Sequence, residues 1–132
     1  MKYMLDTNIC IYIIKQKPVS VLKRLQELKI DDVSISAITL AELEYGVEKS
    51  RKKEQNKLAL AEFIAPIEIL PFDDIAAQKY GELRASLERK GKPIGSLDML
   101  IAAHALSREL VLVTNNIKEF KRIPSITVKN WV

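Results

Sequence analysis

The chain has few of the residues that would indicate a disulfide-stabilised, repetitive or membrane-spanning protein. It has one cysteine, and only 4 glycines and 5 prolines among 132 residues. A single cysteine excludes an internal disulfide and a multi-cysteine zinc site. The apolar run at residues 9–14 is too short to cross a bilayer, and Asp6 and Asn8 interrupt it as a signal-peptide core. We therefore expect a cytoplasmic protein that forms a single domain over residues 1–132.

Several common catalytic motifs are also missing. The sequence contains neither G-x-G-x-x-G nor G-x-x-x-x-G-K-[ST], so the usual dinucleotide and P-loop phosphate sites are absent. No G-x-S-x-G segment offers a nucleophilic serine. The one histidine, His104, lies six residues after Asp98 on a predicted helix, about 240° round its axis, so the two do not share a face. We expect His104 and Cys10 to be core residues.

Short β-branched runs alternate with helical patterns along the chain. A composition of 48% hydrophobic and 29% charged residues is typical of a globular domain that buries a core. The pattern predicts strands at 2–5, 33–36, 67–70, 110–114 and within 126–131. It predicts helices at 7–15, 18–29, 37–50, up to 65, around 76–87, at 96–107 and briefly after 116. This order predicts an α/β fold with a mostly parallel sheet covered on both faces.

Four polar side chains follow predicted strands or begin predicted helices: Asp6, Glu42, Asp98 and Asn116. The carboxyl ends of parallel strands lie along one edge of a sheet, so we expect these side chains to converge there. Carboxylates that converge repel one another, and a hard divalent cation such as Mg²⁺ or Mn²⁺ offsets that repulsion. Such a metal can activate a water for phosphodiester hydrolysis.

Each of these residues also has a purely structural interpretation. Asp and Asn are preferred helix N-caps, and Ser96 is placed to cap the helix that holds Asp98. The position of Glu42 in its helix distinguishes these two interpretations most clearly. If its helix begins at Thr39, Glu42 completes a capping box; if the helix begins near Ser36, Glu42 lies a turn inside and is free.

Two segments carry local excesses of positive charge within a formal net charge of +4. They are "KSRKKEQNK" at 49–57 and "RASLERKGK" at 84–92. Such runs are compatible with solvated helix ends and with contacts to a phosphate backbone. The candidate RNA-binding residues are Lys49, Arg51, Lys52, Lys53, Arg89, Lys90 and Lys92.

Four blocks of the sequence together resemble a known family. They are "MLDTNICIYIIK", "ISAITLAELEYGVEKS", "RKGKPIGSLDMLIAAHAL" and "LVLVTNNIKEFKRIPSI". In this order they resemble the PIN-domain ribonucleases and, within them, the VapC-type toxins of bacterial toxin-antitoxin modules. The resemblance covers nearly the whole chain and implies a small α/β/α sandwich around a parallel sheet.

The resemblance implies a role for each residue at a matching position. Asp6, Glu42 and Asp98 match the acidic metal ligands of the family. Asn116 stands where many members have an aspartate, which leaves two alternatives open. Glu119, one helical turn later, supplies the missing carboxylate, or the site holds one ion firmly and recruits a second with RNA. The remaining two matches are supporting residues: Thr114, near the metal or its water, and Asn8, which orients the first aspartate.

The resemblance further implies an Mg²⁺- or Mn²⁺-dependent endoribonuclease that inhibits translation. Its partners would be a VapB-like antitoxin, a second copy in a homodimer, and an RNA substrate. The "TNNxxEFxRIP" tail is associated with cleavage in the anticodon loop of initiator tRNA. Two other functions remain compatible with the residues themselves: an inactive RNA- or protein-binding domain, and a small metal-dependent phosphatase.

Overall fold

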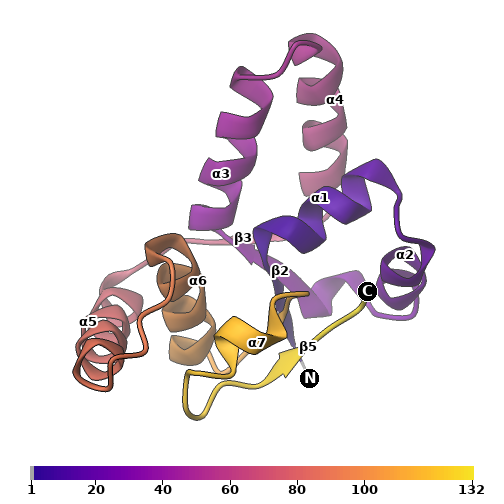
Figure 1. Ribbon diagram of the computed structural model, residues 1–132. Coiled ribbons are helices and arrows are strands. Elements are labelled where there is room, and N and C mark those ends of the chain that lie inside the picture. The colour runs from indigo at the N-terminus through magenta and orange to yellow at the C-terminus, as the bar shows by residue number, and fades with distance from the viewer. Residues whose placement is uncertain (1) are drawn as a thin grey trace.

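Five parallel strands form the centre of the molecule. The computed structural model describes residues 2–132. Its strands are Tyr3–Leu5 (β1), Val33–Ser36 (β2), Glu68–Leu70 (β3), Val111–Val113 (β4) and Val128–Lys129 (β5). They lie in the order β3-β2-β1-β4-β5, and every neighbouring pair is parallel (Figure 1). The predicted α/β fold with a parallel sheet is confirmed.

Helices occupy the segments between the strands, close to where the sequence pattern predicts them. They are Thr7–Lys15 (α1), Val19–Gln26 (α2), Ala37–Glu48 (α3), Lys53–Ile64 (α4), Asp74–Arg89 (α5), Ser96–Ser107 (α6) and Ile117–Phe120 (α7). The helix predicted at 18–29 ends three residues earlier, at Gln26, and a short 3-10 helix, Ile30–Asp32 (η1), follows before β2. None of the helices described over residues 2–132 is long and apolar enough to span a bilayer.

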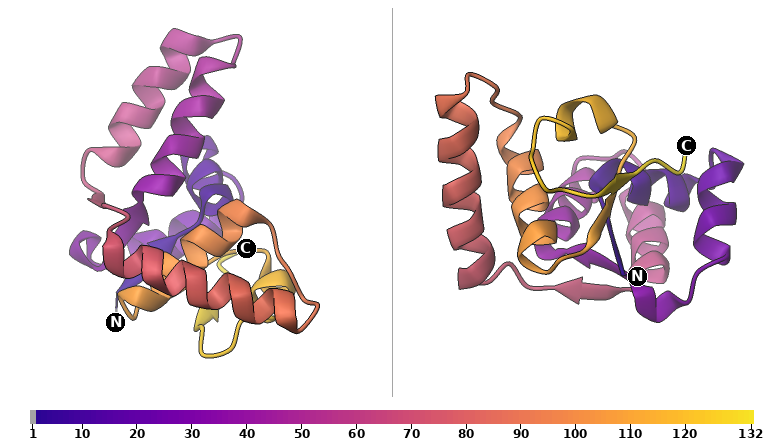
Figure 2. Two further views of the ribbon diagram at one scale, coloured as in Figure 1. Left: turned by 90° about the vertical axis from the view of Figure 1, so that its left-hand side faces the viewer. Right: turned by 90° about the horizontal axis from the view of Figure 1, so that it is seen from below.

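The helices cover both faces of the sheet, because successive side chains of a strand point to opposite faces. In β1, Met4 packs in a cluster with residues of α5, α6 and α7, whereas Leu5 packs in a second cluster with residues of α1, α2, α3 and α4. Figure 2 shows α5 and α6 on one side of the sheet and α1 and α2 on the other. The molecule is therefore an α/β/α sandwich, from which the α3–α4 pair projects (Figure 1).

The strand order determines where polar side chains can meet. From β1 the chain adds β2 and β3 on one side, then returns to add β4 and β5 on the other. In an open parallel sheet a ligand crevice forms at this reversal, beyond the carboxyl ends of the strands. Asp6 directly follows β1, Thr114 directly follows β4, and α3 directly follows β2. The topology thus brings three of the predicted positions to one edge.

Candidate active site

Asp6 is both a helix cap and a member of the acidic group. Its carboxylate accepts a hydrogen bond from the Ile9 N–H at 2.9 Å, so it caps α1, and only 5% of the residue is exposed. Burial raises the pKa of Asp6, and the charge of Glu42 adds to the rise. Hydrogen bonds from the Thr114 hydroxyl and the Ile9 N–H act in the opposite direction. Asp6 therefore caps α1 and also lies near enough to Glu42 to feel its charge.

Glu42 is free of the capping box that Thr39 would have formed. Helix α3 begins after Ser36, whose hydroxyl accepts from the Ile38 N–H at 3.0 Å. Glu42 therefore lies in the second turn, where its carboxylate accepts from the Thr7 hydroxyl at 2.7 Å. Thr7 was missed as a candidate, because nothing in the sequence pairs α1 with a residue of α3.

Asp98 has the most perturbed carboxyl of the group. It is half-buried in the first turn of α6. Burial raises its pKa to about 6, and the charges of Glu119, Asp6 and Glu42 contribute in that order. The predicted cap at Ser96 is wrong: Gly95 is the N-cap residue, and Ser96 is already the first helical residue. The charges of three other acids thus act on Asp98.

Asn116 and Glu119 are joined by a hydrogen bond. The Asn116 amide donates to Glu119 Oε2 at 2.6 Å, and the Gly95 N–H donates to Glu119 Oε1 at 3.1 Å. These two bonds lower the pKa of Glu119, the Gly95 bond most, so the carboxylate is favoured in its ionised form. Each oxygen keeps further lone pairs for another ligand. Asn116 and the Gly95 N–H therefore hold the Glu119 carboxylate in place.

The two predicted supporting residues lie at the same edge. Thr114 is fully buried and accepts a hydrogen bond from the Asn116 N–H at 2.9 Å. The Thr114 hydroxyl also donates a hydrogen bond to the Asp6 carboxylate, which lowers the pKa of Asp6. The Asn8 side chain is exposed, and it is the Asn8 backbone N–H that donates to Asp6. The local chain thus stabilises the Asp6 carboxylate through a hydroxyl and two backbone groups.

The chemistry of this donor set suits a hard cation. Asp6, Glu42, Asp98 and Glu119 offer only carboxylate oxygens, the ligands that Mg²⁺ and Mn²⁺ prefer. Within residues 2–132, however, no three acidic, histidine or cysteine side chains are close enough to form a ready-made metal site. The carboxylates are therefore near enough to repel one another, but they do not yet share one coordination sphere.

His104 and Cys10 are core residues, as predicted. Both are fully buried. Burial lowers the pKa of His104 and raises that of the Cys10 thiol. His104 Nδ1 lies 2.8 Å from the Ser36 hydroxyl, and its ring packs edge-on against Phe72 with centroids 5.3 Å apart. His104 therefore links α6 to the start of α3 and takes no place among the carboxylates.

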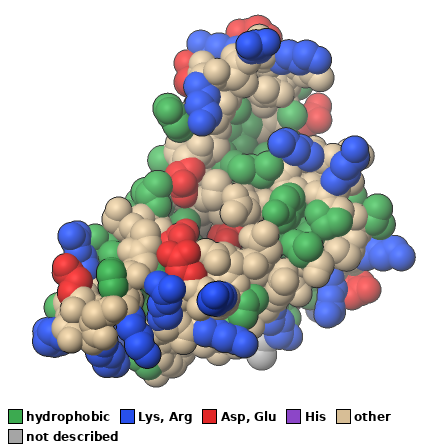
Figure 3. Space-filling model, in the orientation of Figure 1, with side chains coloured by type: hydrophobic (Ala, Val, Ile, Leu, Met, Phe, Trp, Pro, Cys, Tyr) green, Lys and Arg blue, Asp and Glu red, His purple; other side chains and the backbone are tan. Residues whose placement is uncertain are grey.

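The predicted basic residues fall into two separate places. Lys49, Arg51, Lys52 and Lys53 are at the outer end of the α3–α4 pair, and Arg89, Lys90 and Lys92 are at the end of α5 and in the loop after it. Figure 3 shows acidic side chains in the middle of this face, with Lys and Arg side chains at the far tip and beneath the acids. Lys118, Lys121 and Arg122 are also exposed and were not among the predicted residues, although the run "KEFKR" could have indicated them.

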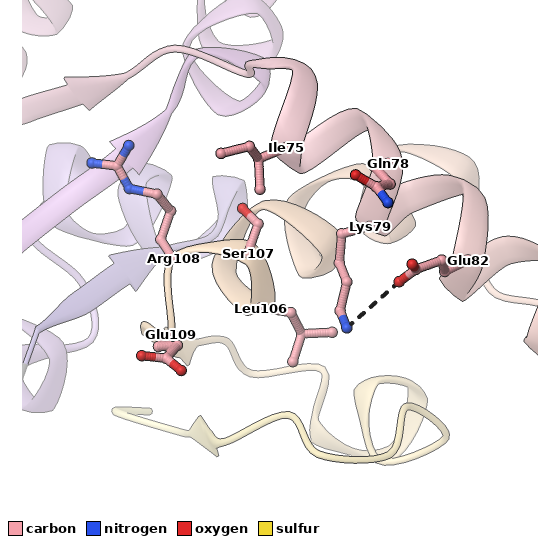
Figure 4. Close-up of a pocket in the computed structure, with 8 residues that line it drawn as sticks. All are labelled: Ile75, Gln78, Lys79, Glu82, Leu106, Ser107, Arg108 and Glu109. Atoms are coloured by element: carbon pink, nitrogen blue, oxygen red, sulfur yellow. Dashed lines mark ion pairs between the residues drawn. The ribbon is translucent and has the colours of Figure 1, made fainter.

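Two cavities of the molecule differ in their position relative to the acidic group. A cavity of about 520 Å³ lies between α5 and the end of α6, with none of the predicted site residues in its lining (Figure 4). Because α6 begins at the acidic edge, its last residues are at the opposite edge of the sheet. A groove of about 250 Å³ lies between α1, α3 and α4, and Glu42 lines its border. The groove therefore adjoins the acidic group through Glu42.

The similarity to known proteins agrees with this site. The family model described as "PIN domain" matches residues 3–126, a span that contains all four acids. The chain belongs to the PIN-domain family. Ribonuclease VapC2 of Rickettsia felis is 53% identical to this PIN domain over 132 residues, which cover 99% of this chain and 98% of that protein. The tRNA(fMet)-specific endonuclease VapC of Salmonella typhimurium is 49% identical over 131 residues, with coverage of 99% and 98%.

Solved structures agree as well. The crystal structure of VapBC2 from Rickettsia felis bound to a promoter DNA fragment contains a chain that superposes on this PIN domain with a TM-score of 0.94. Sequence identity is 51%, and each chain is covered to 100%. The resemblance to VapC-type toxins is therefore confirmed, and so is the predicted enzyme class, a ribonuclease.

Proposed function

We propose that this PIN domain is an Mg²⁺- or Mn²⁺-dependent endoribonuclease toxin of the cytoplasm, with Asp6, Glu42, Asp98 and Glu119 around the metal. The observation that carries the proposal is the raised pKa of Asp98, which follows from burial and from the charges of the other three acids. A protein that accumulates unfavourable charge of one sign at a sheet edge needs a counter-charge there, and a divalent cation supplies it. The bound metal would generate the attacking hydroxide and stabilise charge on the scissile phosphate.

The protein's own groups hold this arrangement in place. Thr7 fixes the Glu42 carboxylate, and Thr114 and the start of α1 fix that of Asp6. Asn116 and the Gly95 N–H hold Glu119 in its ionised form. Ligands held by other hydrogen bonds lose less freedom on binding a metal. Asn116 therefore has a positioning role in this proposal.

The substrate class follows from relatives. Two proteins similar to this chain over 131 residues are named tRNA(fMet)-specific endonucleases, at 49% and 46% identity. We therefore propose tRNA as the substrate, with the anticodon loop of initiator tRNA as the site of cleavage. A single-stranded loop can reach such a site, because its bases and backbone can splay towards the protein.

The partner is proposed to be a VapB-like antitoxin. Similar solved structures are VapBC complexes, and the groove between α1, α3 and α4 provides an apolar surface beside Glu42. Its apolar lining residues include Ile11, Ile14, Leu43, Val47 and Leu60. An apolar segment of the antitoxin would lie in this groove and extend a basic side chain to the carboxylates. We propose that the toxin is a homodimer that assembles further with the antitoxin.

The proposal is tested by incubating the purified, antitoxin-free protein with total tRNA in Mg²⁺, in Mn²⁺ and in chelator. Asp6→Asn and Asp98→Asn serve as nearly isosteric variants. We expect cleavage that requires both the metal and each aspartate, with fragments that map the cut. Binding of RNA without cleavage in either metal would favour an inactive binding domain instead, and preferential hydrolysis of a phosphate monoester would favour a phosphatase.

A further inference from the structure

Two basic segments far apart in the sequence form one surface in the fold. The Arg122 guanidinium donates to the Pro93 carbonyl at 3.0 Å, and the Gly95 N–H donates to Glu119 at 3.1 Å. These two bonds join the loop between α5 and α6 to α7 and the residues after it. The cations at the end of α5 and in the loop after it therefore belong to the same surface as the cations of α7 and the two residues after it.

We call this surface the basic rim. It consists of Arg89, Lys90, Lys92, Lys118, Lys121 and Arg122. All six side chains are exposed, and none takes part in the ion pairs found among residues 2–132. Figure 3 shows Lys and Arg side chains over α7 and the adjacent end of α5. The rim therefore holds six positive charges available to an outside ligand.

The rim borders the acidic group directly. Glu119 is the point of contact, because it is bonded to the loop and the charge of Arg122 lowers its pKa. Glu88, an acid beside the rim, forms an ion pair with Arg84 within α5, with Glu88 Oε1 3.5 Å from Arg84 Nε. Its charge is therefore balanced by a residue outside the rim. A polyanion that approached the carboxylates from this side would thus meet cations before it met the acids.

The other side of the acidic group is different in character. The groove beside Glu42 is largely apolar, and its lining includes a single cation, Lys15. The cations of the α3–α4 tip begin at Lys49, seven residues beyond Glu42 along α3, which corresponds to about 10 Å. Lys53 is paired with Glu48 at 2.9 Å, and the Lys49 ammonium lies 4.8 Å from the centre of the Tyr45 ring. The α3–α4 tip therefore has fewer cations outside ion pairs than the rim has. Those cations also lie about a Debye length from the acidic group.

We propose that the RNA backbone reaches the active site across the basic rim, with the phosphates on one side of the scissile bond contacting Lys90, Lys92, Lys118 and Lys121. This proposal rests on the nuclease function proposed above and adds the path of the substrate. Its physical reason is that phosphates near the acids must be held against the repulsion of those acids, which requires cations at short range. The α3–α4 tip then contributes little to RNA affinity.

The test compares three quadruple variants that each lower the formal net charge from +4 to 0. The rim variant replaces Lys90, Lys92, Lys118 and Lys121 by Gln. The tip variant replaces Lys49, Arg51, Lys52 and Lys57 by Gln. The control variant replaces Lys17, Lys23, Arg24 and Lys29, which lie around α2, by Gln. All twelve side chains are exposed, so all three proteins should fold.

KM and kcat for cleavage of the tRNA pool are measured in Mg²⁺ at several salt concentrations. We expect the rim variant to raise KM by roughly 10- to 100-fold near 0.1 M salt and to leave kcat at saturation nearly unchanged. The slope of log KM against log salt should fall by about 3, since each phosphate contact to a single strand contributes about 0.7. KM should rise much less in the tip and control variants, and by similar factors in both. Such a rise would reflect only the lower net charge of the protein.

Several outcomes would overturn the proposal. Equal increases of KM in all three variants would mean that only net charge matters, and a larger increase in the tip variant would place the RNA on α3–α4. Loss of antitoxin binding with unchanged KM would assign the rim to the protein partner. If the unaltered protein cleaves no RNA, the nuclease function fails instead. Binding of tRNA to the three variants in an Asp6→Asn background would then still decide the path.

Discussion

Replacing Asp98 by Asn should stabilise the metal-free fold while it abolishes catalysis. The reason is that the folded protein holds the Asp98 carboxyl at an unfavourable place, where burial and neighbouring acids raise its pKa from 3.8 to about 6. Asparagine has nearly the same shape and carries no charge. The substitution therefore removes the repulsion but also removes a candidate metal ligand.

The size of the gain follows from the pKa. Each pKa unit corresponds to about 1.4 kcal/mol, so the rise from 3.8 to about 6 would cost at most about 3 kcal/mol. Asp98 is only half-buried, and solvent screening reduces this to roughly 1 to 2 kcal/mol. Loss of a favourable charge in the first turn of α6 subtracts about 0.5 kcal/mol. We expect a net gain of about 1 kcal/mol, or roughly 3 to 5 °C in Tm.

The sign of the pH dependence gives a second check. Well below pH 3.8 the Asp98 carboxyl is protonated in both the folded and unfolded states, and it imposes no penalty. As pH rises from 4 to above 6, the unfolded chain loses its proton first, so the original protein loses stability. The advantage of Asp98→Asn should therefore grow over this interval and stay constant above it.

The assay is urea unfolding in chelator at pH values between 4 and 8, with and without added Mg²⁺. Mg²⁺ should stabilise the original protein more than the variant, because ligand binding to the folded state adds to its stability. A variant less stable than the original protein at pH 7.5 in chelator would refute the reasoning. So would an advantage that does not change with pH.

Three further predictions concern neighbouring residues. Ser36→Ala removes the cap of α3 and leaves His104 without a partner, so urea unfolding should show a loss of roughly 2 to 3 kcal/mol, whereas Ser36→Thr should lose much less. Thr7→Val releases the Glu42 carboxylate, so kcat should fall roughly 10-fold with little change in Tm, and Thr7→Ser should restore it. The Cys10 thiol is buried with a raised pKa, so it should react with a thiol reagent only as the protein unfolds; rapid labelling of the native protein would contradict its burial.

The element order could be predicted from the sequence because each element has its own local signal. The run "VSIS" is β-branched and short, and α6 is apolar almost all round, which is typical of a helix buried on several sides. The end of the second helix could not be predicted as well. Leu28 and Lys29 continue its apolar and basic pattern, but the Lys29 backbone is already extended before η1. Pattern alone does not show where packing stops a helix.

The start of α3 shows a different limit. Ser36 and Thr39 are both good N-caps, so the sequence left the role of Glu42 undecided. The choice of Ser36 follows from its fully buried hydroxyl, which lies 2.8 Å from His104, 68 residues later in the chain. Tertiary contacts of this kind decide between caps that are locally equivalent.

The α/β fold and the family could be predicted from local patterns, and the acids stood out because carboxylates are costly to bury without a partner. How those residues combine depends on contacts between segments that are distant in the chain. Asn116 holds Glu119, and the loop before α6 joins α7 to form the basic rim. The physical reason is that hydrogen bonds and charges act over a few ångströms of space, which separation along a chain does not reveal.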